Sequence, residues 1–263
     1  MDCLSQLLFL GTGAADWDPA AQGPGHRAYS SLLVDGHILI DCTLSALDAL
    51  GRKKINLQDI TDVLITHTHD DHYQPEALRQ LAGAAAEAGR PPIKIHMHRA
   101  AARAAMMTPS TAVYVPHAAG AAFHLANYSI LPLEANHPGT LPREKALHYL
   151  FSRDQRHWLY ATDGAWILYP SWQAIRTHPL SGLVIDCTIG AGHAGDYRIF
   201  EHNSLPMVRL MVDTFVKQQI LKPGAPVVLT HLARTLHPGR AELDRQLEKP
   251  FIAAFDGYET AIR

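Results

Sequence analysis

The sequence predicts a layered α/β fold, and three observations lead to this prediction. Short apolar runs bounded by turn residues indicate buried strands, and segments with helical propensity lie between them. The same order of strands and helices returns in the second half of the chain, as in layered α/β proteins. A chain of 263 residues with 47% hydrophobic residues can bury a large core, and no linker divides it, so residues 1–263 are predicted to form one domain.

The first half opens with a buried strand that enters a glycine turn, followed by two strands that flank Asp35-Gly36, a dipeptide typical of hairpins. A short helix, a strand and an Ala-rich helix come next, with Pro75 in the expected first turn. A further strand and helix follow, and the weaker pattern after them predicts a loop or lid. In order, the expected ranges are 7–10, 31–34, 38–41, 44–50, 63–66, 75–88, 93–97 and 100–107, with the loop at 109–120.

The second half repeats this alternation. Ser204 is expected to cap a helix whose inner face carries Met207, Leu210, Met211, Thr214 and Phe215. A last surface helix is expected at 241–248. The strands of this half are expected at 129–133, 147–151, 158–161, 183–186 and 227–230.

Composition limits the partners and the compartment. A net charge of −2 offers no general attraction for nucleic acid, so nucleic acid is not an expected partner. Cys3, Cys42 and Cys187 form no C-x-x-C pair, which fits reduced, mostly packed thiols in a cytoplasm. No signal-like segment and no run of ~18 apolar residues is found, so we expect a cytoplasmic protein without a membrane partner. A homodimer is compatible with the sequence.

One short segment carries most of the chemistry. Thr66-His67-Thr68-His69-Asp70-Asp71-His72 follows the apolar run Asp62-Val63-Leu64-Ile65 and places three imidazoles and a carboxylate within one turn. Such a group is costly to bury unless a metal orders it. Residues two apart in extended backbone point to the same side, so His67 and His69 can bind one ion. If the chain then turns into a helix, Asp71 and His72 can hold a second ion. Zinc suits these ligands, with manganese or iron as alternatives.

Two ions need more ligands than one turn supplies, and three later strand ends provide candidates. His137 follows the strand expected at 129–133, Asp163 ends the strand in Leu159-Tyr160-Ala161-Thr162-Asp163, and His231 ends the strand expected at 227–230. The sequence thus predicts a distributed metal centre of a hydrolase.

With these residues the chain resembles the metallo-β-lactamase superfamily, whose five motifs occur here in the same order. It is most similar to the phosphodiesterase branch that includes the cyclic phosphodiesterase of the carbon-phosphorus lyase pathway. That likeness rests on Leu10-Gly11-Thr12-Gly13-Ala14, Ser30-Ser31-Leu32-Leu33-Val34, Ile40-Asp41-Cys42, Asp186-Cys187 and His202-Asn203. It runs from about Leu7 to the C-terminus.

The resemblance implies a four-layer αβ/βα sandwich with the site at one edge. It implies that His67, His69 and His137 bind the first metal, that Asp71, His72 and His231 bind the second, and that Asp163 bridges them. A shared hydroxide would attack a small or cyclic phosphate ester, with Asp71, Asp163 and His202 as catalytic residues. His202 would contact the phosphate or protonate the leaving oxygen. Members of that branch also carry a cysteine cluster for a structural zinc; residues 16–27 contain no cysteine, so that site is not expected here.

Other polar residues are weaker candidates. His96 and His98 imitate the H-x-H spacing, but no acidic residue or third His follows, so no metal role is expected. His193, in a glycine-rich loop, is a candidate substrate contact. Asp41 ends a strand and is a candidate to orient a ligand histidine through its second ring nitrogen. Three arginines are candidates for a phosphate clamp: Arg27, Arg198 and Arg234.

Three other functions fit the same motifs. The same metal centre could hydrolyse a lactone or thioester, because an activated hydroxide also attacks carbonyl carbon. An RNA-processing nuclease is a further alternative, against which the near-neutral charge counts. A non-catalytic metal-binding accessory protein of cofactor biosynthesis is the alternative outside enzymes, and the intact set of seven ligands argues against it.

Overall fold

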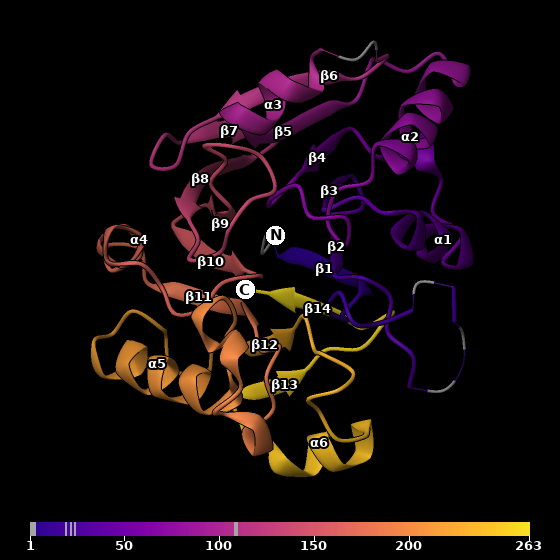
Figure 1. Ribbon diagram of the computed structural model, residues 1–263. Helices are drawn as coiled ribbons and strands as arrows, with labels where there is room; N and C mark the ends of the chain where they lie inside the picture. The colour runs from indigo at the N-terminus through magenta and orange to yellow at the C-terminus, as the bar shows by residue number, and fades with distance from the viewer. Residues whose placement is uncertain (1–3, 19, 22, 24, 108–109) are drawn as a thin grey trace.

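The computed structural model describes residues 4–18, 20–21, 23, 25–107 and 110–263, and within these residues two seven-stranded sheets stack face to face (Figure 1). The first sheet has the order β14-β1-β2-β3-β4-β5-β6 and the second β13-β12-β11-β10-β9-β8-β7. The first contains β1 (Ser5–Gly11), β2 (Ser31–Val34), β3 (Ile38–Ile40), β4 (Asp62–Leu64), β5 (Lys94–His98), β6 (Val113–His117) and β14 (Glu259–Ile262). The second contains β7 (Phe123–Leu125), β8 (Tyr128–Glu134), β9 (Leu147–Arg153), β10 (Arg156–Ala161), β11 (Leu180–Asp186), β12 (Val227–Thr230) and β13 (Phe251–Ala253).

Helices cover the outer face of each sheet (Figure 1). The first sheet carries α1 (Leu44–Arg52), α2 (Pro75–Glu87) and α3 (Arg99–Ala105), and the second carries α4 (Tyr169–Ile175), α5 (Leu205–Lys217) and α6 (Arg240–Gln246). Short 3₁₀ turns lie at η1 (Leu57–Asp59), η2 (Ala191–His193) and η3 (Tyr197–Phe200). None of the helices in the described ranges is long and apolar enough to cross a membrane.

The core lies in three apolar layers, which explains why the strands are apolar on both faces. In β4, Val63 faces the helices, whereas Leu64 faces the opposite sheet. In β11, Leu183 and Ile185 face the helices, whereas Val184 packs between the sheets. Helix, sheet, sheet and helix therefore form four layers, and the predicted α/β sandwich is confirmed.

Strand direction brings the later candidate residues to one edge. The strands β10, β11 and β12 pair in parallel, and β8 runs in the same direction because both β8 and β10 pair antiparallel with β9. In the other sheet, β3 and β4 are parallel. Two hydrogen bonds join the start of β9 to the segment after β4: Leu147 N to Thr66 O (2.9 Å) and Tyr149 Oη to Ile65 O (2.6 Å). The carboxyl ends of β3 and β4 in the first sheet therefore meet those of β8, β10, β11 and β12 in the second.

Two local predictions are wrong. The loop or lid expected at 109–120 contains the strand β6, because Val113 to His117 pairs in parallel with β5; Pro109 itself lies outside the described residues. Helix α5 begins after Ser204 as expected, but Leu210 is 58% exposed and the buried face carries Leu205, Val208, Met211, Val212 and Phe215. The amide of Leu205 donates to Ile189 O (2.8 Å), so the helix start is fixed against the core and this fixes which face turns inward.

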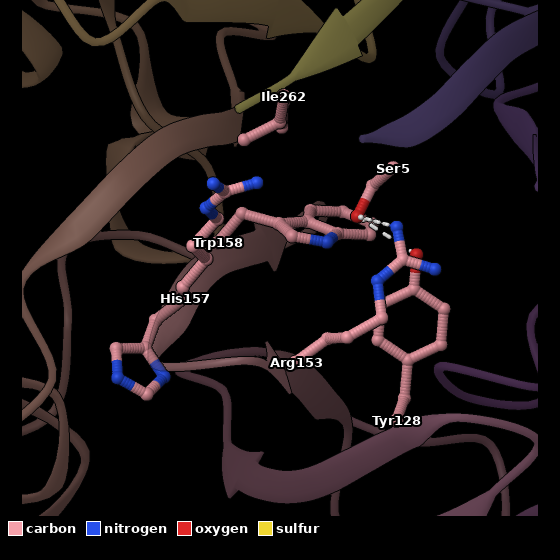
Figure 2. Close-up of a pocket in the computed structure, with 7 residues that line it drawn as sticks. Ser5, Tyr128, Arg153, His157, Trp158 and Ile262 are labelled. Atoms are coloured by element: carbon pink, nitrogen blue, oxygen red, sulfur yellow. Dashed lines mark hydrogen bonds between the residues drawn. The ribbon is translucent and has the colours of Figure 1, made fainter. Parts of the chain in front are cut away.

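A polar cluster lies at the opposite end of the strands, where β9 ends (Figure 2). Arg153 pairs with Asp35 (2.8 Å) and lies over the ring of Tyr128, whose hydroxyl donates to Ser5 Oγ (2.7 Å). The adjoining cavity measures about 10 Å³, room for one water at most, so this cavity does not offer a substrate site. Cys42 and Cys187 are buried free thiols, as predicted, and Cys3 lies outside the described residues.

Candidate metal centre

The turn after β4 carries four clustered candidates, His67, His69, Asp71 and His72, into two sets of possible ligands. The amides of His72 and Tyr73 both donate to His69 O (2.9 Å each), which closes one turn that begins at His69. The rings of His67 and His72 lie 4.5 Å apart, as do those of His67 and His69, so the two sets of ligands adjoin each other, and Asp71 and His72 belong to the second set. The spacing predicted two such sets of ligands, and their assignment to two separate ions stays a prediction.

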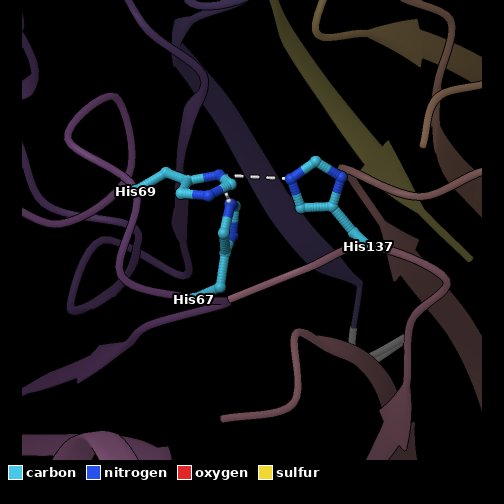
Figure 3. A group of neighbouring side chains, drawn as sticks. All are labelled: His67, His69 and His137. Carbon is cyan, nitrogen blue, oxygen red and sulfur yellow. Dashed lines mark hydrogen bonds between the residues drawn. The ribbon is translucent and has the colours of Figure 1, made fainter. Parts of the chain in front are cut away.

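The first group joins His67 and His69 to His137, which follows β8 (Figure 3). His67 Nε2 lies 2.8 Å and His137 Nε2 lies 3.2 Å from His69 Nδ1. His137 Nδ1 donates to Glu201 O (3.1 Å), and His67 Nδ1 lies 3.1 Å from Thr66 Oγ1, so both Nε2 atoms are free to bind. Three ring nitrogens thus converge on one point. Their lone pairs would repel one another, whereas a metal ion at that point would bind all three.

The second group joins Asp71 and His72 to Asp163 and His231, and all four are buried. His72 Nε2 lies 2.7 Å from Asp163 Oδ2 and 3.3 Å from Asp71 Oδ2. His231 Nε2 lies 3.5 Å from each of the same two oxygens. Two imidazole nitrogens and two carboxylate oxygens thus surround a second point, a donor set that suits a divalent metal.

Asp163 lies between the two groups. Its Oδ2 is 3.4 Å from His67 Nε2 in the first group and 2.7 Å from His72 Nε2 in the second. Its Oδ1 is buried and has no hydrogen-bond partner among the described residues, although His202 Nδ1 is 3.0 Å away. A buried carboxylate that contacts imidazoles of both groups, with a second carboxylate beside it, is a donor set that a divalent cation would accept. The residues present therefore fit a metal centre.

Two buried carboxylates hold the imidazoles of the second group. Asp41 Oδ2 is 2.7 Å from His72 Nδ1, and the same carboxylate accepts from the amide and hydroxyl of Thr66. Asp186 Oδ2 is 3.3 Å from His231 Nδ1, with Thr188 Oγ1 at 2.8 Å from the same nitrogen. Contacts of this kind leave each Nε2 free for a metal.

The sequence made Asp41 a candidate to orient a ligand histidine. Asp186 was named only as part of a motif shared with the phosphodiesterase branch, and this role was not predicted for it. The signal was present, because Asp186 ends an apolar strand in the same way as Asp163 ends another.

The backbone at three of these strand ends is also unusual. Asp41, Asp163 and His231 have positive φ values of 59°, 62° and 57°. Each such residue costs about 1 kcal/mol or more and persists only where its surroundings fix it.

His202 adjoins the second group from the segment between η3 and α5. Its Nδ1 lies 3.0 Å from Asp163 Oδ1, 3.2 Å from Asp186 Oδ2 and 3.2 Å from Thr188 Oγ1. Burial by itself lowers the pKa of His202, but the carboxylates of Asp163 and Asp186 outweigh it and raise the pKa to about 11. The imidazole is therefore held in its protonated form in the metal-free protein.

The pKa values of the other buried groups are also shifted, because several carboxylates and imidazoles lie close together. Burial opposes ionisation of Asp163, yet the surrounding histidines, His231 and His137 foremost, hold its pKa well below the usual range. Burial likewise opposes protonation of His72, but Asp71, Asp163 and Asp41 raise its pKa well above the ordinary value. His67 is different: burial and then His72 lower its pKa well below that value. The site without metal is thus a tightly coupled set of charges.

A pocket of about 210 Å³ opens onto these groups. Of the weaker candidates, Arg198 lines this pocket, whereas His193, Arg27 and Arg234 do not. His96 pairs with Asp62 (2.9 Å) instead of a metal group. The pocket is lined by Ala14, Ala15, Asp16, His69, Asp71, His137, Asp163, Thr188, Arg198, Glu201, His202, His231 and Ala233.

One family model matches the N-terminal part of the chain. Residues 5–82 match the family model described as Anti-Pycsar protein Apyc1. None of the curated proteins compared with the chain matches it.

Solved structures match nearly the whole chain. A new diphosphatase from the PhnP family is 21% identical, with 99% of this chain and 98% of that chain covered and a TM-score of 0.75. The metallo-β-lactamase fold protein YhfI from Bacillus subtilis is 15% identical, with 98% and 100% covered and a TM-score of 0.74. The short form of human tRNase Z is 18% identical, with 98% and 99% covered and a TM-score of 0.69. The chain therefore has the metallo-β-lactamase fold, as its motifs predicted.

Proposed function

We propose that the protein is a dinuclear metal-dependent hydrolase that cleaves a small phosphodiester, cyclic esters included. The observation that carries this proposal is the meeting of two ligand groups around Asp163, with His202 beside them in one pocket. The fold likeness to a protein named as a diphosphatase supports phosphate chemistry.

Each group would hold one ion. His67, His69 and His137 would hold the first, and Asp71, His72 and His231 the second, with Asp163 shared. When bound, two divalent ions such as zinc or manganese supply an activated water and neutralise the charge on the phosphate oxygens. The chain's own part is to fix these ligands at one wall of the pocket.

His202 would be the general acid. The carboxylates of Asp163 and Asp186 face its Nδ1, which leaves Nε2 to donate a proton to the leaving oxygen. Thr188 also contacts Nδ1 and is bound to Asp186 (2.9 Å), so the ring is held from one side only. A positioned acid of this kind contributes ~100- to 10,000-fold to a rate.

The pocket favours a small substrate. Its volume of about 210 Å³ is below the range of about 300–1,000 Å³ usual for drug-sized ligands. At its rim Arg198 is paired with Asp196 (2.8 Å), and the chain has a net charge of −2, so neither feature favours a long polyanion such as RNA.

The variant His202→Ala tests the role of the acid. It should retain its metal but lose ~100- to 10,000-fold in turnover of a phosphodiester with an alkoxide leaving group. A 4-nitrophenyl phosphodiester needs little protonation on leaving, so its turnover should fall much less. The exposed His193, outside the pocket, gives the control variant His193→Ala. Equal losses on both esters, or no loss, would remove the general-acid assignment.

Substrate class is tested on the metal-loaded wild-type protein. Rates on phosphodiesters should exceed those on a matched panel of lactones and thioesters. The reverse order would favour the carbonyl hydrolase, and no turnover of either panel would favour a metal-binding accessory protein.

A further inference from the structure

A second set of contacts joins the two loops that form the first ligand group, His67, His69 and His137. Thr68 lies between the two ligands of the β4 turn, and its hydroxyl donates to Glu144 Oε2 (2.6 Å). Its carbonyl accepts from Thr140 Oγ1 (3.0 Å). Thr140 and Glu144 both belong to the loop that leads from His137 to β9, so this loop binds the H-x-H turn twice.

Glu144 is built into this position. Its side chain is 8% exposed, and the same Oε2 also accepts from the amide of Leu141 (3.1 Å). Gly139 packs against the carboxyl group: a Cβ at residue 139 would lie 2.6 Å from Glu144 Cγ and Oε2. The second oxygen, Oε1, is buried with no hydrogen-bond partner among the described residues. Burying a carboxylate in this way is costly, so the contact with Thr68 is expected to serve a purpose beyond packing.

The first ligand group lacks a feature of the second, and this indicates what the contact between Thr68 and Glu144 does. In the second group, Asp41 and Asp186 face the Nδ1 atoms of two ligand imidazoles. Within the described part of the chain, no carboxylate hydrogen-bonds the ring nitrogen that His69 turns away from its group. The direction of His69 is therefore set by its backbone, and the backbone next to it is what Glu144 and Thr140 hold.

We infer that Glu144 is a positioning residue that, through Thr68, fixes His67 and His69 opposite His137 and so sets the affinity of the first metal position. This inference rests on the metal centre of the proposed function. It assigns Glu144 no contact with metal or substrate.

Competition between the protein and a chelator tests it, with the two ions read as separate steps on zinc-loaded full-length protein. The variants His69→Ala and His231→Ala identify which step belongs to which position. Glu144→Ala should weaken the first ion by less than the ~10- to 100-fold that follows removal of a group bonded directly to a metal ligand, and leave the second ion unchanged. Thr68→Val removes only the hydroxyl and should give the same selective loss. Because both variants break the hydrogen bond between Thr68 and Glu144, adding Thr68→Val to Glu144→Ala should lower the affinity little further.

Two further variants separate positioning from general destabilisation. Glu144→Gln keeps an oxygen that can accept from Thr68 and Leu141, so it should retain most of the affinity. Glu134 lies nearby, with its carboxylate paired to Lys145 (2.6 Å), and gives the matched control Glu134→Ala, which should change neither step. Equal weakening of both ions, or no difference from the control, would overturn the role of Glu144. If Glu144→Ala does not fold, Thr68→Val decides alone. A wild-type protein that binds no ion would instead overturn the proposed function, and this inference with it.

Discussion

The two ligand groups differ in how the protein holds them. All four residues of the second group are buried, and carboxylates contact the far side of two of its imidazoles. In the first group only His67 is buried, while His69 and His137 are half-buried, and their supports are a hydroxyl, a backbone carbonyl and the loop contact through Thr68. The second position is thus preorganised by side chains, whereas the first depends on two loops. We expect the second ion to be held more tightly.

The largest effect is expected at the residue that both groups share. Asp163→Ala removes the carboxylate that lies within 4.0 Å of five imidazoles, so these lose their shared counter-charge: His67, His72, His137, His202 and His231. We expect the loss of one ion and weaker binding of the other, with turnover reduced by more than ~1,000-fold, the upper range for one stabilising group. Metal analysis beside steady-state rates measures both. Retention of two ions with wild-type affinity would show that Asp163 does not join the groups.

A smaller and more selective effect is expected from Asp41. Asp41→Asn replaces the carboxylate that faces His72 Nδ1, so the second ion should bind ~10- to 100-fold more weakly, whereas the first, which Asp41 reaches only through Thr66 and His67, should lose less affinity. Asp48→Asn, on the exposed face of α1, is the matched control. If Asp41→Asn weakened the first ion more than the second, the distinction between the two metal positions would be wrong. That distinction holds that buried carboxylates fix the second position, whereas loop contacts fix the first.

The smallest effect concerns a region away from both groups. His96 joins Asp62 (2.9 Å) to His117 (2.9 Å), and burial followed by the charge of His96 lowers the pKa of His117 to about 4. The unfolded chain therefore binds this proton first as the pH falls, so the contribution of His117 to stability is present above pH 6.5 and is lost between about 6.5 and 4. It is worth less than ~1.4 kcal/mol per pH unit.

His117→Gln should flatten the pH dependence of the free energy of unfolding in that window, as chemical denaturation would show, with or without metal. An NMR titration of His117 with a pKa near 6.5 would contradict this. Because the cluster lies apart from the ligands, it also serves as a reference for the two metal positions.

The features that could be predicted from the sequence are those that depend on neighbouring residues, such as ligand spacing and the ends of strands. The H-x-H spacing and the strand ends located seven side chains that the structure brings together, since a strand's carboxyl end is readable from its apolar run. Long-range contacts decided the rest. The strand β14 forms by pairing with β1 at the other end of the chain, β6 by pairing with β5, and the inner face of α5 is set by the bond of Leu205 to Ile189. Glu144 gains its place from a partner far along the chain, which no local pattern reveals, whereas the position of Asp186 at a strand end was readable and only its contact with His231 was not.

The most direct test of the two-position account is the number of metal ions per chain. Wild-type protein, loaded with zinc or manganese and freed of excess ions, should hold two, and His69→Ala should hold one. One ion or none in the wild-type protein, after either metal is supplied, would contradict the account.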